Sequence, residues 1–209
     1  MSHFTVMVIG ENPEEQLIPF EEVYDDDGSE LVKDVDYLEK EKGYYERDFK
    51  GRYPTFEDYI KNFCCHEYTI VSCGETISEE DKRKRNGWGR YDENGKIIEL
   101  YLRKNPNAKW DWYSPGGRWS GYLILKSGEC VDSALKKDID FEEMTKVFER
   151  YGYATFAYIL NSEWHERGEM HYFGITSNEK DKDVWQAQFE KMIQSLPDDT
   201  RLTVFDCHI

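Results

Sequence analysis

The chain has 209 residues, a mass of 24.9 kDa and a formal net charge of -16, with 33% charged and 15% aromatic residues. This length suits one large domain with a proper core, and the aromatic content supplies apolar surface that disordered chains lack. The negative charge argues against DNA or RNA binding through a basic patch, because affinity for a phosphate backbone comes from clustered lysine and arginine.

Cysteine usage and the N-terminus indicate the compartment. The five cysteines form no CxxC pair, and their odd number disfavours a disulfide framework. The first residues lack the basic region and the apolar length of a signal peptide, and no segment approaches a membrane span. We therefore expect a soluble cytoplasmic protein with reduced thiols and no membrane partner.

The N-terminal part of the chain predicts a strand followed by an insertion. Residues 3–9 are rich in β-branched and apolar side chains, and the sequence GENP ends this strand. Residues 11–60 hold 17 acidic and 6 basic side chains, and an apolar period behind Thr55 predicts a helix near their end. We interpret residues 11–63 as an acidic, partly helical insertion.

The remaining elements alternate between strands and helices. Strands are predicted near residues 68–72, 96–102 and 119–125, and a helix over 140–151 begins at Asp140. Residues 154–160 and 170–175 are expected to pair as a hairpin, before a helix over 178–196 and a last strand over 201–209.

These elements predict the fold class. They favour one α+β domain over residues 1–209, with helices packed on one face of a mainly antiparallel sheet. A ferredoxin-like order is one such arrangement. It makes the first and last strands antiparallel neighbours and thereby brings His3 close to His208.

The segment KWDWYSPGGRWSGY is the first candidate site. Proline and glycine favour a tight turn that a ligand can approach closely, arginine offers a fork of donors for an anion, and indole faces stack on bases. A cross-strand aromatic cluster is the structural alternative. The candidate ligand-binding residues are Trp110, Asp111, Trp112, Tyr113, Gly116, Gly117, Arg118 and Trp119, with Arg167 added from the second site.

The second and third candidate sites supply acid and base groups. WHERGEM is interpreted as a polar hairpin turn in which Glu166 could act as an acid or base. In the last strand, Asp206 and His208 share one face, because alternate strand residues point the same way. Together with His3, that face could hold either a divalent metal or an acid/base pair, although no metal-binding motif supports the first alternative. The candidate catalytic residues are His3, Glu166, Asp206 and His208.

Cofactor and family motifs are mostly lacking. The sequence has no GxGxxG, P-loop, HxH or HExxH pattern, so we predict neither a cofactor nor a metal site. HFT at residues 3–5 resembles one HxT motif of the two-histidine phosphoesterases, but the second copy is missing. HEYT at residues 66–69 and the remaining histidines do not have the required spacing, so we reject that assignment.

Three stretches carry a resemblance to a family. MSHFTVMVIGENPEEQL, NPNAKWDWYSPGGRWSGY and the C-terminal LPDDTRLTVFDCHI together resemble a family of uncharacterised proteins from tailed-bacteriophage genomes. The resemblance covers roughly residues 1–17 and 95–209. It implies an accessory phage protein that acts in the bacterial host cytoplasm, and it leaves the chemistry open.

Three functions follow as hypotheses. The first is an anti-defence factor that binds a small anionic, base-containing ligand, such as a nucleotide-derived host-defence signal, in an aromatic and arginine pocket. The second is a hydrolase acting on such a nucleotide. The third is an acidic protein-interaction inhibitor of a host factor. The sequence leaves a host protein and self-association open as partners.

Overall fold

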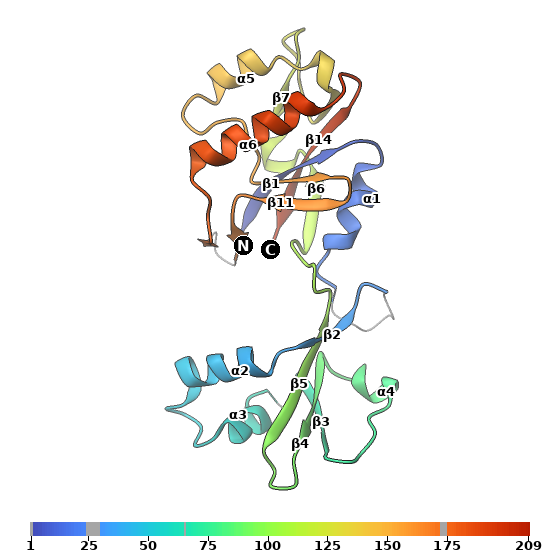
Figure 1. Cartoon of the computed structure of the whole chain (residues 1–209), viewed down its shortest axis with the longest axis vertical. Coiled ribbons are helices and arrows are strands. Elements are labelled where there is room, and N and C mark those ends of the chain that lie inside the picture. Colours follow the sequence, from blue (N-terminus) through green and yellow to red (C-terminus); the bar gives the residue numbers. More distant parts are fainter. Residues whose placement is uncertain (1, 24–29, 65, 172–174) are drawn as a thin grey trace. The chain divides into compact units, whose positions relative to one another are not determined.

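The computed structural model describes residues 2–23, 30–64, 66–171 and 175–209. The chain divides into two compact units (Figure 1). Unit 1 comprises Met1–Glu21 and Lys109–Ile209, and unit 2 comprises Glu22–Ala108. Both units combine helices with open sheets, which confirms the expected α+β class. None of the described helices has the length and apolar character needed to cross a membrane.

The central sheet of unit 1 is built around the first and last strands. Strand β1 (His3–Ile9) pairs antiparallel with β14 (Arg201–His208) along its whole length, with His3 opposite His208. This confirms the expected neighbours. The strand order is β11-β10-β1-β14-β6, and the remaining members are β6 (Trp112–Pro115), β9 (Ser133–Leu135), β10 (Ala157–Leu160) and β11 (Glu163–Glu166).

The order differs from a ferredoxin-like sheet. There the first strand has antiparallel neighbours on both sides, whereas here β1 pairs in parallel with β10. The connection between them passes through helix α5 (Phe141–Val147), and a long crossover of this kind returns the chain in the same direction. A ferredoxin-like order is therefore wrong for unit 1.

Two apolar layers cover the two faces of this sheet. On one face, helices α5 and α6 (Lys182–Ser195) pack on Met7, Leu202 and Val204. On the other face, the short helix α1 (Pro13–Leu17) packs with the alternate residues, such as Val6 and Phe205. The expectation that all helices lie on one face is thus incorrect, because β1 and β14 are apolar on both faces.

The hairpin after α5 is shorter than the sequence suggested. Asn161 and Ser162 have φ values of 53° and 63°, which form a two-residue turn, so β10 pairs with β11. WHERGEM is therefore partly strand and not the turn. Met170 does not pair with β10. It belongs to β12 (Glu169–Met170), which pairs antiparallel with β13 (Thr176–Ser177). Residues 172–174 of the predicted second strand lie outside the described residues.

The segment after the Gly-Gly turn also departs from prediction. Gly117–Trp119 forms a 3-10 turn, and only Leu123–Ile124 of the expected strand forms β7, which pairs with β8 (Cys130–Val131). Positive φ values at Gly116 (62°) and Gly117 (51°) bend the chain away from the sheet immediately after β6.

Unit 2 has a sheet and an apolar core of its own. Strands β2 (Lys33–Asp36), β5 (Ile97–Lys104), β4 (Gly87–Tyr91) and β3 (Tyr68–Ser72) lie in this order. Helices α2 (Leu38–Tyr44) and α3 (Phe56–Asn62) belong to this unit, and Tyr59 and Ile60 of α3 pack with Leu100 and Leu102 of β5. The boundary of the insertion is therefore 22–108, not 11–63, because residues 11–21 pack in unit 1.

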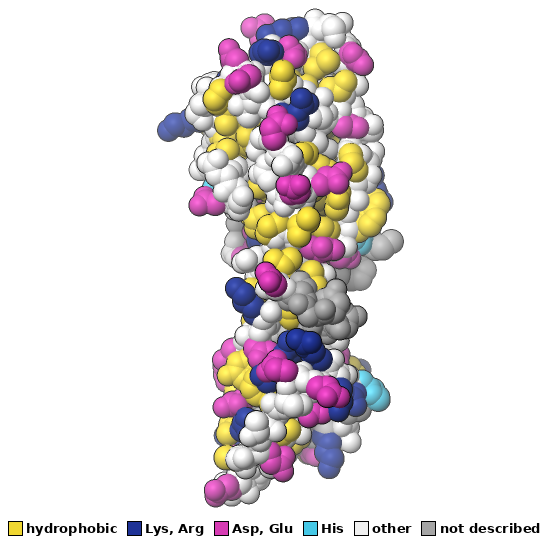
Figure 2. Space-filling view, turned by 90° about the vertical axis from the view of Figure 1, so that its right-hand side faces the viewer, with side chains coloured by type: hydrophobic (Ala, Val, Ile, Leu, Met, Phe, Trp, Pro, Cys, Tyr) yellow, Lys and Arg dark blue, Asp and Glu magenta, His cyan; other side chains and the backbone are white. Residues whose placement is uncertain are grey.

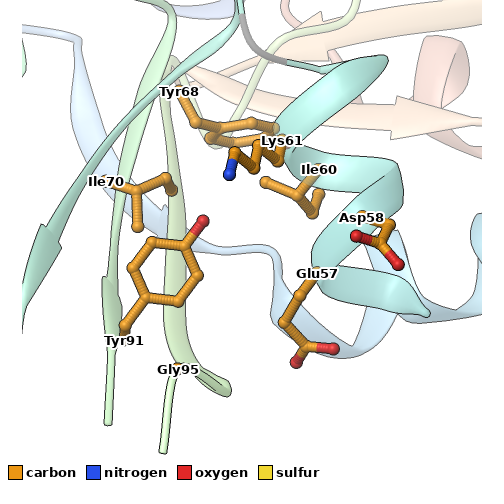
Figure 3. A pocket seen from close by; sticks show the side chains of 8 residues that line it. All are labelled: Glu57, Asp58, Ile60, Lys61, Tyr68, Ile70, Tyr91 and Gly95. Atoms are coloured by element: carbon orange, nitrogen blue, oxygen red, sulfur yellow. The ribbon is translucent and has the colours of Figure 1, made fainter. Parts of the chain in front are cut away.

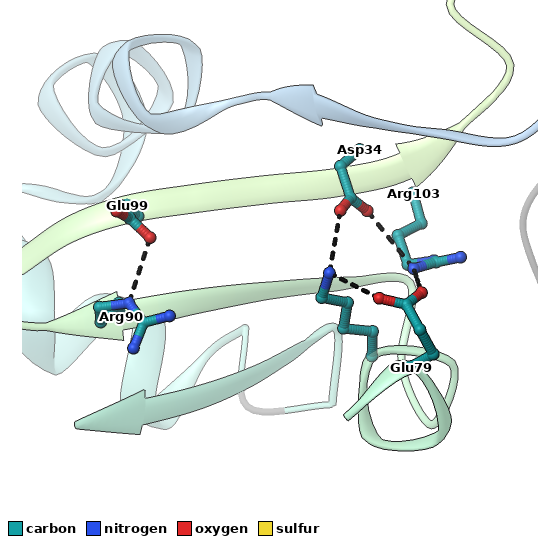
Figure 4. Close-up of polar contacts among 6 residues, drawn as sticks. Asp34, Glu79, Arg90, Glu99 and Arg103 are labelled. Carbon is teal, nitrogen blue, oxygen red and sulfur yellow. Dashed lines mark hydrogen bonds and ion pairs between the residues drawn. The ribbon is translucent and has the colours of Figure 1, made fainter. Parts of the chain in front are cut away.

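Ion pairs cover the other face of the unit 2 sheet. Lys82, from α4 (Glu79–Lys82), contacts Asp34 at 3.4 Å and Glu79 at 2.9 Å, and Arg103 contacts Glu79 at 3.3 Å (Figure 4). Acidic side chains of the insertion are thus partly neutralised by its own basic side chains. Figure 2 likewise shows acidic and basic side chains interspersed on the face in view.

Candidate functional site

Two histidines meet at one end of the unit 1 sheet. His3 and His208 are direct partners across β1 and β14, and their ring centroids lie 4.9 Å apart in an edge-to-face arrangement. Their side chains are 13% and 12% exposed. They lie on the same face as Met7 and Val204, since alternate residues of a strand point the same way.

Asp206 orients the first histidine. The Nδ1 atom of His3 lies 2.8 Å from Oδ1 of Asp206, whose side chain is only 2% exposed. A carboxylate in this position favours the tautomer with the proton on Nδ1. The Nε2 atom of a neutral His3 is then the basic position.

The Gly-Gly turn holds Asp206 in place. The backbone N–H of Arg118 donates to Oδ2 of Asp206 at 3.0 Å. A Cβ atom at Gly117 would lie 2.4 Å from the Cβ atom of Asp206, so only glycine allows this approach. The turn thus contacts Asp206 through its backbone and not through the guanidinium group of Arg118.

Asp111 orients the second histidine. Its Oδ1 atom lies 2.5 Å from Nδ1 of His208, and its side chain is 39% exposed. The Nε2 atom of His208 is buried and has no hydrogen-bond partner in the described part of the chain. A water molecule or a ligand can supply the partner of such a nitrogen.

A surface cavity opens at the histidine pair. It has a volume of about 390 Å³ and is lined by His3, Asp111, Trp112 and His208. The side chain of Trp112 is a large apolar group that remains half exposed, and its ring lies 6.3 Å from the His3 ring. The cavity therefore combines two imidazoles with an accessible indole.

The other aromatic residues of the predicted pocket lie elsewhere. Trp110 is buried and donates to the Leu17 carbonyl oxygen at 3.3 Å, and Tyr113 packs on Phe205 in the same layer. Trp119 packs against the core on the opposite face. The structure does not bring the three tryptophans together, because Trp110 lies before β6 and is buried, Trp112 begins β6, and Trp119 lies in the 3-10 turn that follows.

The side chain of Arg118 is exposed and does not line this cavity. Gly116 lies against the carboxylate of Asp132, where a Cβ atom would come within 2.3 Å. Asp132 accepts from the Gly121 N–H at 2.6 Å. These contacts shape the turn and give Gly116 a structural role.

Glu166 and Arg167 do not join the histidines. Glu166 contacts Nζ of Lys109 and Nε1 of Trp164, both at 2.7 Å, and Trp164 packs in the layer that contains α1. Glu166 is thus on the opposite face of the sheet. Arg167 pairs with Glu179 at 2.5 Å and lies over the Phe156 ring.

The donor set does not indicate a metal centre. Among the residues that the structure describes, no group of three or more His, Cys, Asp or Glu side chains is arranged to hold a metal ion. Each histidine of the pair instead has its own carboxylate. The arrangement supports proton transfer, in which one imidazole accepts a proton and the other donates one.

Unit 2 contains a separate cavity of about 520 Å³ (Figure 3). Helix α3 contributes Glu57 and Lys61 to it, and the strands contribute Ile70 and Tyr91. Glu57 already accepts from the Ile97 N–H at 3.1 Å, which gives it a structural role. This cavity lacks the paired proton donors and acceptors of the histidine site.

Sequence reasoning missed the role of Asp111. It was expected to bind a ligand, but it orients His208 of β14 from its position just before β6. The register against the last strand, which the sequence does not give, was needed to find its partner.

Comparisons with known proteins found no similarity. The chain matches no protein-family model, no curated protein and no solved structure.

Proposed function

We propose that unit 1 is a hydrolase that uses His3 and His208 as an acid/base pair on a small phosphodiester carrying a planar base. The observation behind this proposal is the pair of adjacent imidazoles, each with Nδ1 on a separate carboxylate. This choice favours the hydrolase over simple ligand binding, since binding alone does not require two oriented proton carriers.

The reaction requires only water as a second reactant. A neutral imidazole takes a proton from the water molecule while the water oxygen forms a bond to phosphorus. The bond from phosphorus to the leaving oxygen breaks, and the second histidine, as an imidazolium, donates its proton to that oxygen. The carboxylates of Asp206 and Asp111 orient the rings and stabilise whichever ring is positively charged.

The ligand class follows from the cavity lining. A protonated histidine attracts an anion, and the half-exposed indole of Trp112 offers a stacking face for a base. A volume of about 390 Å³ is within the range of small-ligand sites, roughly 300–1,000 Å³. We therefore assign the ligand as small, anionic and base-containing.

The test is an assay with 2′,3′-cyclic AMP, a cyclic dinucleotide and bis(p-nitrophenyl) phosphate. His3→Ala and His208→Ala should each lower kcat/KM by at least about 100-fold, because each removes one proton carrier. His165→Ala is the matched control, since His165 stacks on Tyr158 at 4.7 Å and is not part of the pair. The pH-rate profile of the wild type should be bell-shaped.

Two results would redirect the proposal. Turnover that survives both histidine substitutions would exclude the acid/base pair. Binding of a nucleotide by calorimetry without turnover of any substrate would leave the binding function, for which Trp112 is the supporting observation.

The biological role remains part of the proposal. If the phage resemblance holds, removal of a nucleotide-derived host-defence signal in the bacterial cytoplasm is the corresponding anti-defence activity. Expression of the protein, but not of the His3→Ala variant, should then restore phage growth on a defended host. An acidic inhibitor of a host factor would instead be insensitive to His3→Ala and sensitive to salt.

A further inference from the structure

Unit 2 contains a buried carboxylate with only neutral partners. Glu41 of α2 is 5% exposed. It accepts from the Tyr59 hydroxyl at 2.7 Å and from the Tyr68 hydroxyl at 3.1 Å, and the Cys64 thiol lies at 3.8 Å. All three groups donate, so both oxygens of Glu41 act as hydrogen-bond acceptors.

The donors themselves remain uncharged. Burial, followed by contacts with Cys64 and Glu41, raises the pKa of Tyr59, and burial followed by the Glu41 charge raises that of Tyr68. Burial raises the pKa of the Cys64 thiol to about 12. Hydrogen bonds therefore satisfy the oxygens of Glu41 without cancelling their charge.

The residues that the structure describes supply no cation to this site. Within the described ranges, neither Glu41 nor Glu67 forms an ion pair with lysine, arginine or histidine. Lys40 and Lys104 lie over the Tyr37 ring, at 4.9 and 5.8 Å, but neither lines the cavity beside Glu41. An uncompensated buried charge is costly unless a ligand or a proton neutralises it.

Aromatic rings and a second carboxylate surround the adjoining cavity. Its volume is about 360 Å³. Its walls include five aromatic side chains and two carboxylates, from Tyr37, Glu41, Tyr44, Tyr59, Phe63, Glu67 and Tyr68. Burial, and then the charge of Glu41, raises the pKa of Glu67, as expected for two carboxylates that share one space.

The position of Tyr68 depends on the sheet beneath it. A Cβ atom at Gly87 would lie 2.7 Å from the Tyr68 ring and 2.3 Å from the Tyr101 carbonyl oxygen. Glycine at this position therefore lets the ring lie on β4 while its hydroxyl reaches Glu41. Tyr68 also lines the cavity shown in Figure 3, so its ring lies between the two cavities.

We propose that this cavity of unit 2 binds a small organic ammonium ion, with the rings contacting its alkyl groups and Glu41 and Glu67 balancing its charge. Aromatic cages bind alkylated ammonium groups because each ring face carries negative potential while the alkyl groups bury against it. An inorganic cation would interact with the two carboxylates but has no alkyl groups to pack against the rings. This inference is independent of the histidine site of unit 1.

The test is a titration of the full chain with tetramethylammonium chloride, followed by NMR, against sodium chloride at equal ionic strength. Saturable shifts should concentrate at Tyr37, Tyr44 and Tyr68. Glu41→Gln should weaken binding by at least about tenfold, since it removes the buried charge while keeping an acceptor. Glu67→Gln should weaken it by about threefold, because Glu67 is more exposed.

Matched controls separate the site from general electrostatics. Glu39→Gln changes the same charge on the same helix, but Glu39 is exposed and pairs with Lys42 at 2.7 Å, so binding should not change. If Glu41→Gln disturbs the fold, the exposed Glu67 and the ring substitution Tyr44→Leu still test the site. Equal affinity for sodium, unchanged binding in Glu67→Gln and Tyr44→Leu, or no saturable binding would each overturn the inference.

Discussion

The two units use a buried carboxylate in different ways. Asp206 in unit 1 contacts an ionisable imidazole and a backbone N–H, whereas Glu41 in unit 2 contacts two phenols and a thiol. The first carboxylate can stabilise a histidine as it gains and loses a proton. The second provides a fixed negative charge beside aromatic rings. The partners, and not the carboxylates, determine which chemistry each unit supports.

The two units also differ in how their sheets are covered. The sheet of unit 1 has an apolar layer on each face, while unit 2 has one apolar face and one face covered by ion pairs. A sheet buried on both sides orders the groups at its end well, which suits a geometry-dependent reaction. In unit 2 the second face carries ion pairs together with the stacked rings of Trp88 and Tyr101.

The largest expected effect comes from comparing two excisions, one of the whole of unit 2 and one that begins just before unit 2 and ends inside it. Replacing residues 22–108 with a short Gly/Ser linker should leave unit 1 folded, because the Lys109 N–H donates to the Phe20 carbonyl oxygen at 2.8 Å and the chain ends already meet. Replacing residues 20–52 should expose the apolar core of unit 2, since β2 and α2 are lost. Circular dichroism and size-exclusion chromatography distinguish these outcomes.

The first excision is also tested by measuring the turnover at the histidine site. The shortened chain should retain the turnover of the full protein, as His3, Asp111, Asp206 and His208 all belong to unit 1. An aggregated product after removal of 22–108, or a cooperative fold after removal of 20–52, would show that the division into two units does not describe stability.

A smaller effect should separate the two carboxylates of the histidine site. Asp206→Ala should lower the free energy of unfolding by about 3 kcal/mol, because it leaves the Arg118 N–H and the His3 ring without their buried acceptor. Asp111→Ala should cost less than about 1 kcal/mol, since Asp111 is exposed. Urea denaturation measures both, and equal losses would contradict the distinction made from burial.

The smallest expected effect concerns the pH dependence of unit 2. The folded-state pKa of Glu67 is raised by burial and then by the charge of Glu41. Its favourable contribution is therefore complete below the ordinary carboxyl pKa and is lost as the pH rises through the raised value. Glu67→Gln should slightly raise the melting temperature at pH 7, and the difference should vanish in acid.

The control for this pH effect is Glu93→Gln, which changes an exposed carboxyl group of the same unit. Thermal melts at several pH values, followed by the NMR signal of the Trp88 indole N–H, report on unit 2, because the other five tryptophans belong to unit 1. A Glu67→Gln variant that loses stability at neutral pH would indicate that Glu67 is favourably paired when folded.

The sequence by itself determined the elements with strong local signals. The strand His3–Ile9, the cap at Thr55 and the last strand were all predictable, because β-branched runs, helix caps and apolar periods depend on neighbouring residues. The shared face of Asp206 and His208 follows from the period of a strand in the same way. The approach of His3 to His208 required only the correct choice of neighbouring strands.

Only the tertiary structure decided how these pieces combine. The parallel pairing of β1 with β10, the contact of Asp111 with His208, and the gathering of Tyr59, Cys64 and Tyr68 around Glu41 join residues far apart in the chain. The acidic composition of residues 11–60 suggested a surface segment. This segment nevertheless contributes buried residues, such as Tyr45, Phe56 and Tyr59, to the separate core of unit 2. A charged residue can be buried only where hydrogen-bonding partners surround it. These partners come from distant parts of the chain, so the local sequence does not identify them.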